Sequence, residues 1–236
     1  MGTAVELREG PKSRPIAAWW HTIFLTVILL GIAISGAMFQ SAEPSSPTLA
    51  RNVLPVYMSL VISELVLVWA VWRGSRRTST SLKDLIGGRW RTSRDVLVDV
   101  CLGIAFWAIL LLVADAWDRL LPVTGHARSI SPLLPQGPLE IAVWIPLSVV
   151  AGMVEEIVFR GYFQRQFQAL TQRRAAAIAL QAILFGVTHG YQGAAACMKI
   201  ILIGVMFGML AAWRQSLRPG IIAHVWTDIF SGVFRS

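Results

Sequence analysis

Two adjacent glutamates and one arginine lie in an otherwise apolar stretch of the sequence. Glu155 and Glu156 follow an apolar run that begins at Leu139, and Arg160 comes four residues after Glu156. Charged groups inside a membrane span cost several kcal/mol each, so they are rare there and usually mark function. On a helix, neighbours point about 100° apart, whereas residues four apart share a face. We therefore expect Glu156 to form an ion pair with Arg160, and Glu155 to face a different cavity.

Two further pairs with the same spacing follow in later apolar stretches. Phe185 precedes His189 by four residues, and His224 precedes Asp228 by four. We expect the Phe185 ring to pack against the His189 imidazole, and Asp228 to orient the His224 imidazole and fix its tautomer. Each pair also has a structural interpretation, in which the polar groups only join neighbouring helices through hydrogen bonds.

The three motifs together place carboxylates and two imidazoles on three apolar helices. A carboxylate can act as general base, alone or with an imidazole, and activate water. A second imidazole and a second carboxyl group can then stabilise an oxyanion or protonate a leaving amine. The set therefore fits hydrolysis of an amide bond inside a membrane cavity.

The order of these motifs resembles the CPBP family, which comprises type II CAAX prenyl proteases and ABI-like proteins that process bacteriocins or confer immunity. The resemblance covers about residues 139–234. The residues that carry it are Glu155-Glu156-x-x-x-Arg160, Phe185-x-x-x-His189 and His224-x-x-x-Asp228. Many family members have asparagine where this chain has Asp228. An aspartate can replace the amide as a hydrogen-bond donor only when it is protonated.

The resemblance implies a membrane-embedded endopeptidase. In such an enzyme Glu155 would activate water with the help of His189. His224 and Asp228 would bind the oxyanion or position the substrate. The residues with supporting roles would be Glu156, Arg160 and Phe185.

The sequence leaves the role of a metal open. It has no HExxH motif, which would place two histidine ligands on one helix turn. Carboxylate and imidazole groups are acceptable zinc ligands, so Glu155, His189, His224 and Asp228 could surround a zinc ion. They could equally carry out a glutamate-dependent reaction without a cofactor. We favour the metal-free reaction, because Arg160 already neutralises one acid and no residue set demands an ion.

The composition indicates a polytopic membrane protein. Of the 236 residues, 55% are hydrophobic and only 14% are charged, which excludes an ordinary soluble domain. We expect an all-α bundle of about seven to eight transmembrane spans. The seven predicted spans are approximately 16–39, 56–72, 96–114, 139–158, 175–189, 193–213 and 219–234. The eighth would be a half-buried segment within 115–138 or 160–172, and the proline-rich part of 115–138 could also form a lid or re-entrant turn.

Basic residues predict the orientation in the membrane. The net charge is +8, and most arginines and lysines lie in residues 1–15 and in the loops that would share their side. The positive-inside rule therefore favours a cytoplasmic N-terminus. Topology already accounts for this charge, so we expect no nucleic-acid partner. The expected partners are the lipid bilayer and a membrane-associated peptide or lipidated protein as substrate.

The predicted spans place Glu155 and His189 at different depths in the membrane, although a shared site would need them at the same depth. If the fourth span ended near Val158, Glu155 would lie about 20 Å from His189 along the membrane normal, at ~1.5 Å per residue. A shared site requires them to be close. We therefore expect the fourth helix to continue well beyond Arg160, because the apolar pattern continues through Phe163 and Phe167.

The motifs divide the chain into two regions. Residues 1–138 form helices and loops with no motif that resembles a known family, and residues 139–236 carry the three motifs. The alternative to a protease is a non-catalytic membrane protein, either an immunity-type scaffold or a transporter. Inverted repeats would favour a transporter, and none is evident. An enzyme that acts on lipid or another small substrate is a further alternative that fits the motifs less well.

Overall fold

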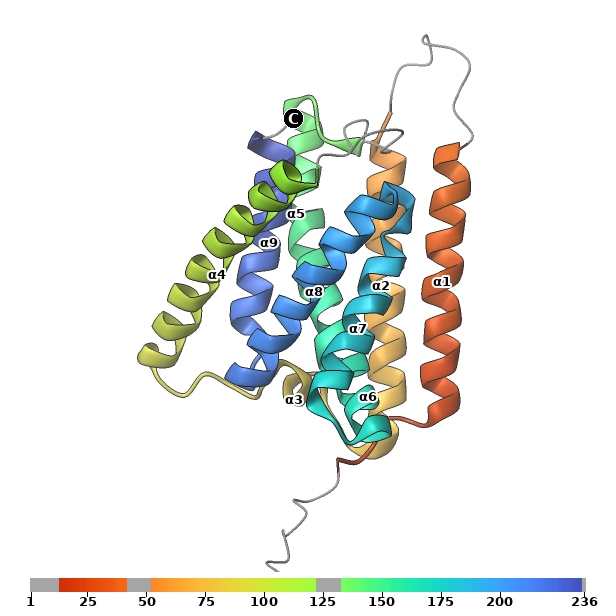
Figure 1. The fold of residues 1–236 in the computed structure, drawn as a ribbon, viewed down its shortest axis with the longest axis vertical. Helices are drawn as coiled ribbons and strands as arrows, with labels where there is room; N and C mark the ends of the chain where they lie inside the picture. Colours follow the sequence, from red (N-terminus) through yellow and green to blue (C-terminus); the bar gives the residue numbers. More distant parts are fainter. Residues whose placement is uncertain (1–12, 42–51, 122–132, 235–236) are drawn as a thin grey trace, which may run out of the picture.

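The described parts of the chain are helical. The computed structural model describes residues 13–41, 52–121 and 133–234 (Figure 1). These ranges contain no strand, so the predicted all-α class is confirmed. Within residues 115–138, where the sequence predicts a lid or re-entrant turn, residues 115–120 are helical and residues 122–132 lie outside the described residues.

Each of the seven predicted spans is a helix, and one short helix, α3, lies in a connection. The helices are α1 (Trp19–Ser41), α2 (Leu54–Ser75), α3 (Leu82–Ile86), α4 (Ser93–Leu120), α5 (Pro138–Glu155), α6 (Gln164–Thr171), α7 (Arg174–Thr188), α8 (Ala194–Arg214) and α9 (Arg218–Phe234). By length and composition, α1, α2, α4, α8 and the α5–α6 rod could each cross a membrane, and α7 is apolar but shorter. The predicted number of spans therefore agrees roughly with the structure.

Local sequence signals explain where several helices begin and end. At the start of α4, the Thr92 side chain accepts a hydrogen bond from the Asp95 backbone, and the Asp95 side chain accepts one from the Thr92 backbone. Helix α5 begins at Pro138, where a missing N–H costs nothing. Helix α8 ends at Gln215, whose φ of 54° lies in the left-handed region.

The fourth predicted helix is much longer than its first apolar run. Helix α5, a π-helical stretch (Glu156–Phe163) and α6 form one continuous rod, Pro138–Thr171, of 34 residues. Glu155 therefore lies near the middle of the rod, as the sequence predicts. π-Helical stretches are uncommon and occur frequently at functional sites. All eight residues of this stretch are buried, so the rod passes through the core of the bundle.

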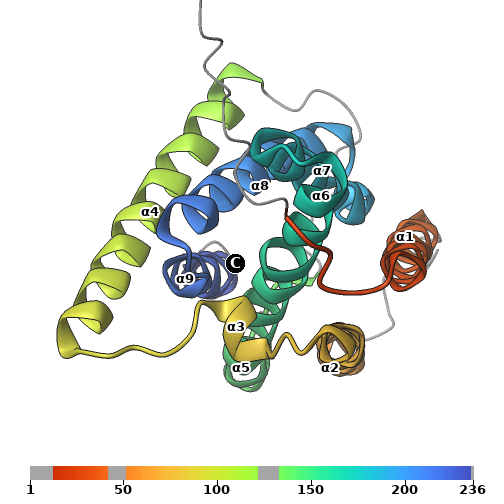
Figure 2. The same ribbon diagram turned by 90° about the horizontal axis from the view of Figure 1, so that it is seen from below.

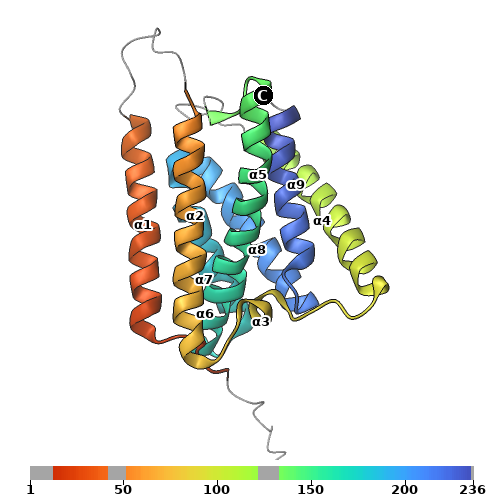
Figure 3. The same cartoon turned by 180° about the vertical axis from the view of Figure 1, so that it is seen from behind.

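Helix α5 is central to the arrangement. It packs against α2 and α9, while α4 leans across α9 and α7 pairs with α8 (Figures 1 and 2). Helix α1 stands at the outer edge next to α2 (Figure 3). In Figure 1, α3 and α6 lie at the lower end of the bundle, the end at which α1 begins. Of the motif-bearing helices, α5 packs on α9, and α7 contacts the π-helical stretch that follows α5.

A glycine allows α5 and α9 to approach closely. A Cβ atom on Gly152 would lie only 2.9 Å from the backbone nitrogen of Val225. Small residues at such crossings let two helix backbones come together in a membrane bundle. Because Gly152 lies one turn before Glu155, and Val225 follows His224, this contact brings the acidic pair next to the third motif.

The boundary that the sequence predicts near residue 138 does not separate the helices in space. Helix α2 packs on α5, and α4 packs on α9, so helices from both regions share one bundle. The division into 1–138 and 139–236 therefore stays a prediction about sequence motifs.

Candidate active site

The predicted ion pair between Glu156 and Arg160 forms in the interior of the bundle. Arg160 Nη1 donates to Glu156 Oε1 at 2.9 Å, and both side chains are at most 1% exposed. The guanidinium carbon lies 4.4 Å from the ring centre of Phe185 and 4.9 Å from that of Phe207. A buried charge without a partner is strongly destabilising, so each member of this pair requires the other.

Glu156 also holds His224, which comes from the opposite helix. His224 Nδ1 lies 3.0 Å from Glu156 Oε1 and donates to it, since a carboxylate only accepts. The sequence predicts that Asp228 orients this imidazole, but Glu156 makes the hydrogen bond instead. The reason is the close packing of α9, because a Cβ atom on Gly220 would lie 3.2 Å from Glu156 Oε2.

The other ring nitrogen of His224 faces two more carboxylates. His224 Nε2 lies 3.5 Å from Glu155 Oε2 and 3.9 Å from Asp228 Oδ2. Asp228 is held in place by its backbone oxygen, which accepts a hydrogen bond of 2.9 Å from Trp144 Nε1. The first and third motifs therefore meet at one imidazole, with an acid on each of two helices beside Nε2.

His189 lies at the end of α7, and its ring packs against Phe185 as predicted. The two ring centres are 4.8 Å apart, and His189 Nδ1 donates to the Phe185 backbone oxygen at 2.8 Å. In a neutral imidazole this leaves the lone pair on Nε2, which has no hydrogen-bond partner among the described residues. Phe185 also lies 6.1 Å from the His224 ring. One phenyl ring thus separates the two histidines.

The structure does not bring His189 into direct contact with the acidic pair. Among the described residues, no ion pair within 4.0 Å joins His189 to Glu155. A water molecule or a substrate group between the two side chains would be needed for them to act together.

A family comparison agrees with this arrangement. Residues 137–230 match the family described as Type II CAAX prenyl endopeptidase Rce1-like. This match supports a CPBP family protease. Comparisons with curated proteins and with solved structures gave no match. The Rce1-like domain contains all three motifs, which confirms the resemblance and supports a protease that is integral to the membrane.

Glu64 joins the site from outside the Rce1-like domain, and the sequence reasoning missed it. It is the only acidic residue of α2, and it interacts electrostatically with Glu155, His224 and Asp228. Its Oε2 atom is buried and has no hydrogen-bond partner among the described residues. The signal was present in the sequence, because a single acid within an apolar span marks a candidate functional residue.

Tyr191 is a second residue that the sequence reasoning missed. Its ring stacks on His189 with the centres 6.1 Å apart, and it lies in the connection between α7 and α8. Burial raises the pKa of the Tyr191 phenol, and the negative charges of Glu155 and Asp228 raise the pKa further. The hydroxyl group therefore stays protonated near neutral pH and can donate a hydrogen bond into the site.

The predicted zinc ligands do not form a metal-binding group. Among the described residues, no three or more His, Cys, Asp or Glu side chains are arranged to hold an ion. In both histidines Nδ1 is the hydrogen-bonded nitrogen, to Glu156 in His224 and to the Phe185 backbone oxygen in His189. We therefore derive no step through a metal.

Proposed function

We propose that this protein is a glutamate-dependent endopeptidase that cleaves a peptide bond of a membrane-associated substrate. The observation that carries the proposal is the position of His224, which is hydrogen-bonded to buried Glu156 and faces Glu155 and Asp228 on its other side. A prenylated CAAX protein is the substrate class that the family suggests. The site is buried among apolar helices, which suits a substrate that is itself anchored in the membrane.

Glu155 is the proposed general base. Its carboxylate takes a proton from a water molecule, and the lone pair on His189 Nε2 helps to orient that water. The resulting hydroxide attacks the carbonyl carbon of the peptide bond. The protonated Glu155 then gives its proton to the amide nitrogen as the carbon–nitrogen bond breaks, which releases an amine and a carboxylate.

His224 and Asp228 are the proposed binding groups for the oxyanion. As an imidazolium, His224 donates through Nε2 to the oxyanion while Glu156 accepts from Nδ1. A protonated Asp228 would supply the second donor, in the position where many family members have asparagine. Donors that are fixed before the reaction stabilise the transition state without reorganisation, which is usually the largest electrostatic contribution to catalysis.

The test is cleavage of a lipidated CAAX peptide and of other membrane-anchored peptides by purified protein in detergent. Glu155→Gln and His189→Ala should each lower kcat by about 10²-fold or more. Glu140→Gln makes the same change as the first variant in the first turn of α5 and should retain activity. Equal rates for Glu155→Gln and wild type would contradict the proposal. A folded wild type that cleaves none of these peptides would instead favour the scaffold or transporter interpretation.

A cytoplasmic N-terminus is a further part of the proposal. The start of α1, the connection that carries α3, and the α8–α9 connection all lie at one end of the bundle (Figure 1). That end carries Arg14, Arg165, Arg214 and Arg218, in agreement with the positive-inside rule. A reporter enzyme that is active only outside the cytoplasm should be inactive when it is fused to the N-terminus. Activity of this fusion would reverse the orientation.

A further inference from the structure

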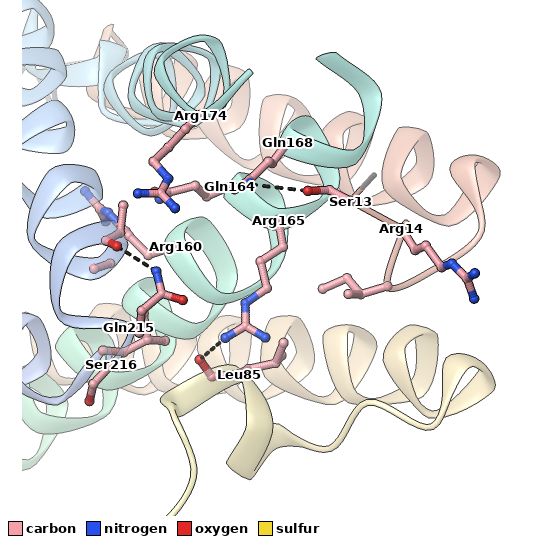
Figure 4. Close-up of a pocket in the computed structure, with 14 residues that line it drawn as sticks. Ser13, Arg14, Leu85, Arg160, Gln164, Arg165, Gln168, Arg174, Gln215 and Ser216 are labelled. Atoms are coloured by element: carbon pink, nitrogen blue, oxygen red, sulfur yellow. Dashed lines mark hydrogen bonds between the residues drawn. The ribbon is translucent and has the colours of Figure 1, made fainter. Parts of the chain in front are cut away.

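A pocket opens at the end of the bundle where α3, α6 and the start of α7 meet (Figure 4). Its volume is about 350 Å³. Pockets that hold small ligands usually measure about 300–1,000 Å³, so this one has the size of a small-molecule site. Among the site residues described above, only Arg160 lines it. The pocket therefore lies behind the candidate active site and is separate from the groups proposed to act on a peptide bond.

The pocket is lined by positive charge. Its walls include Arg14, Arg160, Arg165 and Arg174, and no acidic side chain is among its lining residues. Arg160 is neutralised by Glu156. In Figure 4 the Arg14 side chain points away from the other lining groups. The charge that faces the pocket therefore comes mainly from Arg165 and Arg174.

These two arginines have unused hydrogen-bonding capacity. Arg165 donates through Nη2 to the backbone oxygens of Asp84 and Leu85, which holds its guanidinium at the pocket wall. Its other nitrogens have no hydrogen-bond partner among the described residues. Arg174 forms no hydrogen bond or ion pair within the described part of the chain. A guanidinium group offers five N–H donors in a planar fork, so both side chains can bind an additional anion.

A buried donor on the inner wall also lacks a partner. The Nε atom of Arg160 is buried and makes no hydrogen bond within the described ranges. Further donors are amide groups at the pocket rim, where Gln168 donates to the Ser13 side chain and Gln215 donates to a backbone oxygen. An unpaired buried donor is unfavourable unless a ligand or water satisfies it. The pocket wall therefore presents mostly donors, beside one buried acceptor without a partner among the described residues, Gln164 Oε1.

We propose that this pocket binds a phosphate group carried by a small anionic molecule, with Arg165 and Arg174 as the charged donors. Arginine binds phosphate oxygens in a bidentate manner, and charge-assisted hydrogen bonds of this kind are the strong ones. The volume leaves room for a glycerol-sized group attached to the phosphate. The ligand is either the headgroup of a phospholipid or a soluble phosphorylated compound, because both present the same chemistry. The proposal does not depend on the peptidase activity.

The experiment measures thermal unfolding of the full chain in a neutral detergent, followed by tryptophan fluorescence. One arm adds phosphatidylglycerol, and its control adds a diacylglycerol with the same acyl chains and no phosphate. The other arm adds glycerol 3-phosphate, with chloride at equal ionic strength as the control. A ligand that binds only the folded state raises the Tm in proportion to its saturation.

Arg174→Gln is the test variant, and Arg173→Gln is its matched control, because Arg173 is the adjacent arginine and does not line the pocket. We expect Arg174→Gln to raise the ligand concentration for half-maximal stabilisation by about tenfold, the effect of losing one charged hydrogen bond. Arg173→Gln should leave it within about twofold. Gln168→Glu, which places an acid at the pocket rim, should abolish the stabilisation and serves as the second test variant.

The two arms distinguish the sources of the phosphate. Stabilisation by phosphatidylglycerol but not by glycerol 3-phosphate identifies a lipid headgroup, and the reverse result identifies a soluble ligand. Two results overturn the proposal. One is a wild-type Tm that neither phosphate-bearing compound raises above its control. The other is an equal loss of the ligand-induced rise in Tm in Arg174→Gln and Arg173→Gln. That result would mean that the ligand binds only through the general positive charge of the surface.

Discussion

Glu156 and His224 are joined by a hydrogen bond of 3.0 Å between Oε1 and Nδ1, and both side chains are buried. The same oxygen of Glu156 also accepts from Arg160. One carboxylate oxygen thus links α9 to the cation in the middle of the α5–α6 rod. The supporting residue of the first motif therefore also positions the imidazole of the third motif.

The first prediction concerns the stability of this link. Glu156→Gln should lower the free energy of unfolding by about 3–5 kcal/mol, because it leaves the buried guanidinium of Arg160 without a counter-charge. Asp115→Asn is the matched control, since Asp115 and Arg119 have the same spacing and the same 2.9 Å separation but are more than half exposed. That change should cost about 0–1 kcal/mol. Chemical denaturation of both variants measures the difference, and equal costs would contradict a special role for the buried pair.

The second prediction concerns the departure from the family pattern at position 228. Asp228→Asn should retain activity within about a factor of ten, because an amide donates the hydrogen bond that we assign to a protonated aspartate. Asp228→Ala should lower kcat by about 10²–10³-fold, the usual effect of removing one oxyanion donor. Peptidase assays of both variants test this directly. A loss of activity in Asp228→Asn as large as that in Asp228→Ala would show that the carboxylate itself is required.

The sequence was sufficient for features that depend on spacing along one helix. The pairing of Glu156 with Arg160 and the packing of Phe185 on His189 both follow from residues four apart on a helical face. The long α5–α6 rod followed from an apolar pattern that continued beyond Arg160 and from the need to bring separate motifs together. These features are local, so they required no knowledge of how the helices pack.

Features that depend on packing between helices could not be predicted in the same way. The hydrogen bond from His224 to Glu156 depends on the close approach of α9 at Gly220. The π-helical stretch changes which residues of the rod share a face, and the spacing of residues in the sequence does not predict such a stretch. Arg165 and Arg174 come together at a pocket only because α6 and α7 turn back on each other. Glu64 was the exception, since its position in an apolar span gave a usable signal.

The third prediction tests whether Glu64 serves function at the expense of stability. Glu64→Leu should raise the free energy of unfolding by about 1–3 kcal/mol, because it removes a buried polar atom that has no partner among the described residues. The same change should lower kcat, because it removes a carboxyl group that interacts electrostatically with Glu155 and His224. Glu64→Gln keeps the shape of the side chain and separates the effect of the carboxyl group from that of packing. Denaturation and peptidase assays on the same preparations measure both quantities, and a Glu64→Leu protein that is less stable but fully active would assign Glu64 a purely structural role.

The fourth prediction concerns metal removal. Chelators should leave the rate of peptide cleavage within about a factor of two, since we assign the activation of water to a carboxylate and to the lone pair on His189 Nε2. Among the described residues, no three or more His, Cys, Asp or Glu side chains are arranged to hold an ion. The measurement compares wild type before and after dialysis against a chelator, and then after addition of zinc. Chelator-sensitive activity that zinc restores would contradict the glutamate-dependent mechanism and would require the polar side chains to rearrange around an ion.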